Sequence, residues 1–223
     1  MSAALDLADA HPHARAAALA RARCLLRVGQ RAEAEACLRL ATTPADAPLT
    51  DGEAIETDAQ WARELALTML RAMRAAERRQ EQAAELYERG HFAKAALAYG
   101  EALACIEAGV RDDRHCRAAL HANAAACLRR AGEPDEAVLA CDRALALLPR
   151  FCRALFRRGV CLLEAARPAE AVGAFEALYR VERSWPRLQD WLLRAHAAQR
   201  RVDGGGAAAP GGGRAPRGAP TSA

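Results

Sequence analysis

Arg153 and Arg157 are residues whose type and spacing suggest binding chemistry. They lie four positions apart in the run RALFRRG at 153–159. On a helix this spacing is about one turn, so both guanidinium groups project from the same face. Two such groups can make charge-assisted hydrogen bonds to an anion such as a carboxylate. The alternative is a pair of solvated arginines, which is the usual state of charges on a helix surface.

The eight cysteines and six histidines form no recognisable metal or disulfide pattern. The chain has no Cys-x-x-Cys pair, and Cys116, beside His115 and near His121, lacks the paired spacing of zinc sites. Three cysteines share one position of an internal repeat: Cys24, Cys127 and Cys161. We interpret the cysteines as small buried apolar residues of a protein from a reducing compartment. We therefore predict neither a metal nor a cofactor.

The chain lacks the short motifs of common enzyme sites. It has no glycine-rich phosphate loop, no His-Glu-x-x-His pair and no serine nucleophile elbow. The net charge is +4, and acidic residues alternate with arginines, which favours a solvated surface and indicates nucleic-acid binding only weakly. No apolar run approaches the roughly 20 residues that a membrane span needs, and Asp6 and Asp9 interrupt any signal-peptide pattern. We expect a non-enzymatic protein of the cytosol or nucleus, without a membrane partner.

Composition and periodicity predict an all-α repeat protein. Hydrophobic residues make up 52% of the chain and aromatic residues only 4%, so the apolar content is mostly alanine and leucine, which are strong helix formers. Five positions recur after 34 residues: Ala125, Leu128, Gly132, Ala137 and Cys141 are followed by Gly159, Leu162, Ala166, Ala171 and Phe175. A fixed period of this length indicates a solenoid of stacked helical hairpins.

The repeated segments resemble tetratricopeptide repeats (TPRs). The residues on that family's signature positions are Ala125, Gly132, Ala137, Ala144 and Pro149. A third copy covers residues 76–109, and a weaker copy lies within residues 1–50. The resemblance implies a right-handed TPR superhelix in which the first helix of each repeat lines a concave groove.

The predicted order of segments runs from an N-terminal hairpin to a tail. Residues 1–50 form the hairpin, which ends in a loop at 43–52, and residues 51–75 form a helix that continues into the next repeat, over about 58–89. Three repeats follow at 76–109, 118–151 and 152–185, with an exposed connection at 107–117. Ser184 and Pro186 predict the start of a capping helix at 186–202. The glycine-, alanine- and proline-rich residues 203–223 predict a disordered tail.

One TPR subfamily uses its groove to clamp the C-terminal carboxylates of heat-shock chaperones. Resemblance to that subfamily, taken residue by residue, assigns Asn123, Arg153 and Arg157 to clamp positions of the second and third repeats. In the first repeat, Gln80 stands where the subfamily has lysine, and Ala84 stands where it has asparagine. The resemblance therefore implies a partial peptide-binding clamp with a weaker or changed preference. Its implied partners are the tails of seventy- or ninety-kilodalton heat-shock chaperones.

The layout also resembles the TPR region of J-domain co-chaperones. Both have upstream hairpins, a long helix that leads into three repeats, and a capping helix. The His-Pro-Asp signature of the J domain is absent here, and the nearest string is His11-Pro12-His13.

The competing interpretation is a scaffold subunit of a multi-protein assembly. Such a protein would bind partners through the helix faces around Trp61 and Trp191 and would capture no peptide tail. Trp61 has another possible role, because with Met69 and Met73 it falls mainly at helical steps and is expected to pack on the first hairpin. A change at Arg157 separates the two functions, since only the clamp needs that residue.

Overall fold

The structure is a computed structural model that describes residues 14–42 and 53–205. These residues form helices and turns without a strand, which confirms the predicted all-α class. The helices are α2 (Ala14–Val28), α3 (Arg31–Thr42), α4 (Glu53–Glu88), α5 (Phe92–Gly109), α6 (Arg114–Ala131), α7 (Pro134–Leu147), α8 (Cys152–Glu164), α9 (Pro168–Val181) and α10 (Leu188–Gly205). The predicted loop at 43–52 and the predicted tail from residue 206 onward lie outside the described residues, as do residues 1–13.

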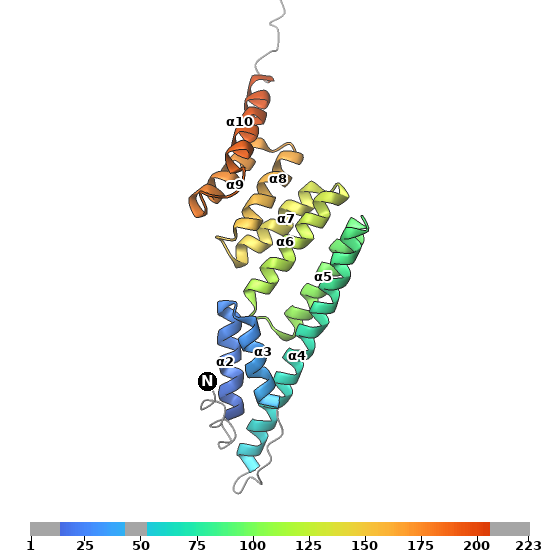
Figure 1. The fold of residues 1–223 in the computed structure, drawn as a ribbon, viewed down its shortest axis with the longest axis vertical. Coiled ribbons are helices and arrows are strands. Elements are labelled where there is room, and N and C mark those ends of the chain that lie inside the picture. Colours follow the sequence, from blue (N-terminus) through green and yellow to red (C-terminus); the bar gives the residue numbers. More distant parts are fainter. Residues whose placement is uncertain (1–13, 43–52, 206–223) are drawn as a thin grey trace, which may run out of the picture.

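The helices stack along one direction (Figure 1). The α2–α3 hairpin and the first half of α4 lie at one end, and α10 lies at the other. The hairpins α4–α5, α6–α7 and α8–α9 follow in chain order between them. With 36 residues, α4 is long enough to pack on both the N-terminal hairpin and α5. None of the described helices combines the length and the apolar character that crossing a bilayer requires.

The buried stripe of α4 includes the methionines but not the tryptophan. Ala62, Ala66, Met69 and Met73 follow one another at steps of three and four residues and are buried in one cluster with α2 and α3. Trp61 is 59% exposed because it precedes Ala62 by one position, about 100° around the helix. The expectation that Trp61 packs on the first hairpin is therefore wrong.

A residue with positive φ ends the first helix of each hairpin. The angle is +89° at Gly29, +80° at Gly90, +87° at Gly132 and +57° at Ala166. At Gly132 and Ala166 the same two backbone hydrogen bonds close the turn, one from the residue's own N–H to the carbonyl three residues back and one from the next N–H to the carbonyl five residues back. The turn is thus retained in the last repeat, although alanine adopts this conformation at a cost of about 1–2 kcal/mol.

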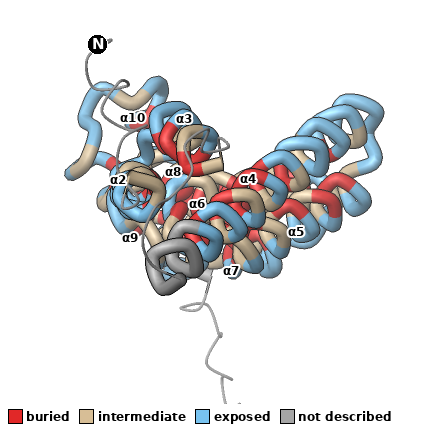
Figure 2. The backbone as a smooth tube through the Cα atoms, turned by 90° about the horizontal axis from the view of Figure 1, so that it is seen from below, coloured by how far each residue is buried: buried red, intermediate tan, exposed pale blue. Residues whose placement is uncertain are grey.

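The core is divided between the two ends of the stack. One apolar cluster joins the N-terminal hairpin to α4 and α5, and the other joins α7, α8, α9 and α10. Between them lies a layer whose buried residues are all alanine: Ala118, Ala122, Ala144 and Ala154. Figure 2 shows the buried residues on the inner sides of the helices. Because alanine is small, this layer lets α6 and α8 approach closely.

An aromatic cluster holds α10 on the last hairpin. The ring of Phe156 lies 6.1 Å from Phe175 and 5.7 Å from Trp191, measured between centroids. Trp191 is therefore half-buried against the core. Ser184 does not cap α10, because that helix begins only at Leu188 and the Ser184 hydroxyl donates to Glu182 instead.

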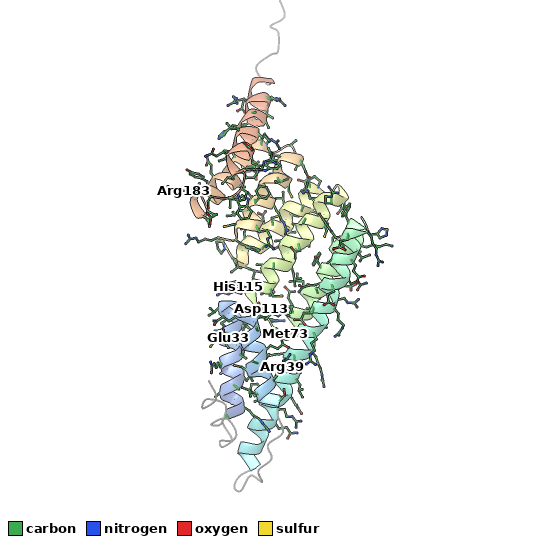
Figure 3. All side chains as sticks on the ribbon, in the orientation of Figure 1. Glu33, Arg39, Met73, Asp113, His115 and Arg183 are labelled. Carbon is green, nitrogen blue, oxygen red and sulfur yellow. The ribbon has the colours of Figure 1, made fainter. Side chains whose placement is uncertain are left out.

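The connection between α5 and α6 is shorter and more buried than expected. Helix α5 continues to Gly109 and α6 begins at Arg114, and the intervening Val110 and Asp113 are 1% and 2% exposed. The Asp113 carboxylate caps α6 by accepting the N–H of Cys116 at 2.9 Å. Helix α2 packs on the start of α6, and Figure 3 shows Asp113 at this junction. The expectation of an exposed connection over 107–117 is wrong for Val110 and Asp113, which are buried where the N-terminal hairpin packs on α6, whereas Arg111, Arg114 and His115 are exposed.

Candidate functional site

Asn123 of α6 and Arg157 of α8 form the centre of the candidate site. The Nη1 group of Arg157 donates to Oδ1 of Asn123 at 3.1 Å and also to the carbonyl oxygen of Ala122. Ala122 belongs to the alanine layer between the two helices, and Arg157 itself is half-buried. One nitrogen of the guanidinium group is therefore fixed by two acceptors from the preceding repeat.

These contacts leave other donors available. A guanidinium group carries five N–H donors, and no acceptor in the described part of the chain bonds Nε or Nη2 of Arg157. Those two nitrogens form an edge that can hold both oxygens of a carboxylate. Because arginine only donates, the Asn123 atom that faces it is the oxygen, and the Asn123 amide nitrogen is left as a further donor.

Arg157 is also a cation without a carboxylate partner. Within residues 14–42 and 53–205, neither Arg153 nor Arg157 forms an ion pair, whereas the neighbouring Arg158 pairs with Asp142 at 2.6 Å. Burial, and then the charge of the exposed Arg153 one turn away, lower the pKa of Arg157, although a guanidinium group remains protonated at neutral pH. A bound anion would offset both effects, so the electrostatics of the site favour one.

Aromatic side chains of the first repeat lie near the arginine. Tyr87 of α4 and Tyr99 of α5 lie within range of the charge of Arg157, and burial raises the pKa of Tyr99 while that charge opposes the rise. The Tyr87 ring meets Phe92 edge-on at 5.2 Å, and the guanidinium group of Arg130 lies 4.9 Å above Phe92. Tyr87 is 37% exposed and is therefore accessible to a ligand.

Sequence reasoning did not select Tyr87. The available signal was an aromatic residue in the first helix of a repeat, in a chain that is only 4% aromatic. That signal is weak, because the same residue type serves equally well as core. Only the structure shows that Tyr87 lies near a charged group of another repeat.

Gln80 lies apart from the centre of the site. Its Nε2 atom is 3.9 Å from Sγ of Cys116, at the start of α6. Cys116 and Asn123 are seven residues apart on that helix, which is about 10 Å along the axis. The structure thus joins Asn123 to Arg157, with Arg153 one turn away, and places Gln80 at a different junction.

Arg31 at the start of α3 occupies that junction. Its Nη1 group donates to Sγ of Cys116 at 3.0 Å, and its Nη2 group pairs with Glu77 at 3.1 Å. Glu77 and Gln80 lie on successive turns of α4, so this part of α4 holds the N-terminal hairpin against α6. The first repeat therefore uses Glu77 and Gln80 for internal packing.

The cysteines are free thiols. Burial raises the pKa of Cys127 to about 11, so that side chain is a neutral thiol at neutral pH. Cys24 is exposed, although its repeat position predicted burial, because no helix of the described residues precedes α2 and covers that face. The described residues contain no group of three potential metal ligands.

Two solved structures share this arrangement of helices. The TPR domain of P58(IPK) aligns with 86% of this chain and 57% of its own length, with a TM-score of 0.55 and 16% identity. The first TPR domain of Spaghetti (RPAP3), solved with the HSP90 peptide SRMEEVD, aligns with 57% of this chain and 94% of its own length, with a TM-score of 0.50 and 20% identity. At these identities the likeness shows the fold.

Two curated proteins are similar in sequence. Human FK506-binding protein-like is 41% identical over 76 residues, which are 34% of this chain and 22% of that protein. The maize HSP-interacting protein is 34% identical over 104 residues, which are 46% of this chain and 14% of that protein. The chain thus spans less than a quarter of the length of these relatives. No protein-family model matches it.

Proposed function

We propose that this tetratricopeptide-repeat protein is a non-enzymatic adaptor that binds the C-terminal carboxylate of a partner protein at Asn123, Arg153 and Arg157. The observation that carries the proposal is Arg157, a half-buried cation without a carboxylate partner and with one free bidentate edge. A carboxylate on that edge would lie on the side of the guanidinium group away from Asn123, whose amide nitrogen is left to bond another group of the peptide. The exposed Arg153 would attract acidic residues that precede the terminus.

The partner class that best fits this chemistry is the acidic tail of a heat-shock chaperone. The Spaghetti domain, which has the same fold, was solved with the HSP90 peptide SRMEEVD, and the maize relative is called an HSP-interacting protein. The first name supports a chaperone of the ninety-kilodalton class, and the second supports a heat-shock protein without giving its class. We propose chaperones of the seventy- or ninety-kilodalton class as partners. Because such chaperones are abundant in the cytosol and nucleus, we propose the same location for this protein.

The affinity should be modest. A carboxylate held by two Arg157 nitrogens would make two charge-assisted hydrogen bonds, each contributing about 1.5–3 kcal/mol, and a bond from the Asn123 amide to another group of the peptide would add about 1 kcal/mol. Their sum approaches the roughly 8 kcal/mol of a micromolar complex before the cost of immobilising the peptide. Gln80 lies apart from the centre, so the first repeat adds little. We expect a Kd of about 10–100 µM.

Calorimetric titration of the full chain with the peptide SRMEEVD, with free and with amidated C-terminus, tests the proposal. Binding of the free peptide, its loss on amidation and its loss in Arg157→Gln are expected. Arg180→Gln is the matched control, because Arg180 is an exposed arginine of α9 that pairs with Glu176 on its own helix. Equal binding of the two peptides, or unchanged binding by Arg157→Gln, would overturn carboxylate capture.

A scaffold role without tail capture remains the second candidate, and the exposure of Trp61 favours it. A tryptophan that is 59% exposed is a common anchor of protein interfaces. Trp191, in contrast, is half-buried and packs against Phe156 and Phe175, so it offers less surface to a partner. If partner recovery from cells depends on Trp61 and is unchanged by Arg157→Glu, the scaffold role is the correct one.

A further inference from the structure

A second group of arginines surrounds a hollow where the N-terminal hairpin meets α6. The hollow has a volume of about 420 Å³. It is lined by Arg27, Arg111, Asp112, Arg114, Arg117 and Leu147. These residues come from α2, the α5–α6 connection, α6 and α7, so no single helix builds the site. The labelled residues Asp113 and His115 mark its level in Figure 3.

Two carboxylates neutralise part of this charge. Asp112 accepts Nε of Arg23 at 2.9 Å and Nε of Arg27 at 3.1 Å. Burial alone would raise the pKa of Asp112, but these two arginines hold it below its ordinary value. Glu107 accepts Nη2 of Arg117 at 3.0 Å. Asp112 is thus ionised at neutral pH, and both carboxylates are already engaged by arginines.

The positive charge at the hollow still exceeds the negative charge. The four lining arginines and Arg23 give five cations, while Asp112, Glu107 and the buried Asp113 give at most three anions, which leaves an excess of +2 (5 − 3). The hollow also lies at the first turn of α6, where the positive end of the helix dipole adds positive potential. The excess of arginines and the helix terminus would both attract an anion bound in the hollow.

Unused hydrogen-bond donors face the same hollow. The side chain of Arg114 makes no hydrogen bond or ion pair with any described residue, and the side chain of Arg111 donates only through Nε, to the carbonyl of Glu107 at 3.0 Å. Arg27 likewise uses only Nε, on Asp112. Three guanidinium groups therefore retain both terminal nitrogens for a ligand.

We propose that this hollow, which we call the arginine pocket, binds a phosphoryl dianion, presented by a phosphorylated side chain of a protein. A phosphoryl group carries a charge near −2 and three acceptor oxygens, which matches the charge excess and the several converging donors better than a carboxylate does. A nucleic acid fits less well, because no aromatic side chain lines the pocket to stack on a base. The pocket is separate from the site at Asn123 and Arg157, so the proposal does not depend on tail capture.

The test is a nuclear magnetic resonance titration of the full chain with a short glycine- and alanine-based peptide that contains one phosphoserine. The peptide is acetylated and amidated, so it offers no carboxylate to Arg157. Parallel titrations use the unphosphorylated peptide, inorganic phosphate and a single-stranded RNA oligonucleotide. The protein variants are Arg114→Gln and Arg111→Gln/Arg114→Gln, with Arg74→Gln on the exposed face of α4 as the matched control.

We expect the phosphopeptide to shift the amide signals at the start of α6 and the unphosphorylated peptide to leave them in place. Each lost guanidinium group should weaken binding about tenfold. Arg114 has no protein partner to lose, so Arg114→Gln should remain folded. Equal affinity for inorganic phosphate would support the same phosphoryl chemistry and identify the free ion as the ligand. No response to either phosphate, unchanged binding by the double variant, or tighter binding of RNA would overturn the proposal.

Discussion

Adding one methyl group at Gly159 should destabilise the last repeat, although the same change elsewhere in that repeat should stabilise it. A Cβ at Gly159 would lie 2.5, 2.6 and 2.9 Å from three atoms of the Phe175 ring. That ring is fully buried and is enclosed by Phe156 and Trp191, so it has no free space to enter. Overpacking of this kind costs up to about 3 kcal/mol. The better helix propensity of alanine returns about 1 kcal/mol.

We therefore expect Gly159→Ala to lower the free energy of unfolding by about 2 kcal/mol. For a chain of this size, that is a decrease in Tm of about 4–8 °C. Gly173→Ala, on the exposed face of α9 with no atom within 4 Å of the added Cβ, should instead raise Tm by about 2–4 °C. Both positions lie in the α8–α9 hairpin, so they report on the same repeat. Urea and thermal unfolding followed by circular dichroism give the two values, and equal effects of the two substitutions would refute the packing argument.

Three further substitutions test the turns, the cap and the packing of α4 on α5. Ala166→Gly removes the strain of an alanine with positive φ in the last hairpin turn, so it should raise the free energy of unfolding in urea by about 1 kcal/mol. No gain in that assay would mean that Ala166 is not strained. Asp113→Asn keeps the acceptor for Cys116 but removes the charge. Burial raises the pKa of Asp113. The protonated carboxyl group therefore keeps its full contribution to stability below the unfolded-state pKa of about 3.9, and that contribution is lost as the pH rises through the folded-state pKa. Over that rise the variant should gain stability relative to the natural protein, and the opposite trend would contradict the raised pKa of Asp113. Gly109→Ala would bring a Cβ to 2.4 Å from that of Ala72, so a net loss of about 1–2 kcal/mol is expected in the same unfolding assay, and unchanged stability would mean that the two helices separate easily.

The repeat architecture was predictable because its determinants are local. Small residues at fixed positions, such as Gly159 opposite Phe175, set how closely two adjacent helices approach, and their spacing is visible in one repeat unit. The positive-φ turn at Gly132 is also a local feature. Where the local signal was incomplete, the prediction failed: Trp61 has the right apolar character but lies one position outside the buried stripe.

The candidate site was predictable only in part. The shared repeat position of Asn123 and Arg157 indicated that they face the same groove, but not that the carbonyl of Ala122 fixes the arginine. The arginine pocket was not predicted at all, because Arg27 and Arg114 meet only through the docking of the N-terminal hairpin on α6. Contacts of that kind depend on the angle between hairpins, and no local pattern in the sequence specifies it.

The docking of that hairpin also explains why the first repeat departs from the clamp pattern. Gln80 faces Cys116, and Arg31 bonds both Cys116 and Glu77. A lysine at position 80 would bring a second cation to the guanidinium group of Arg31 and weaken the attachment of the hairpin. Glutamine avoids that repulsion, so we expect position 80 to disfavour lysine while the N-terminal hairpin is docked.

This reasoning predicts opposite results for the two substitutions that would restore the clamp residues. Ala84 is exposed on α4, so Ala84→Asn can add an amide donor to the groove and should tighten binding of a free C-terminal peptide about tenfold. Gln80→Lys should leave peptide affinity unchanged and should lower the thermal stability of the α2–α3 hairpin, measured by hydrogen exchange of its amides. Tighter peptide binding by Gln80→Lys, with an intact α2–α3 hairpin, would contradict this reasoning. It would show that a side chain at position 80 can reach the peptide and that docking of the hairpin does not disfavour lysine there.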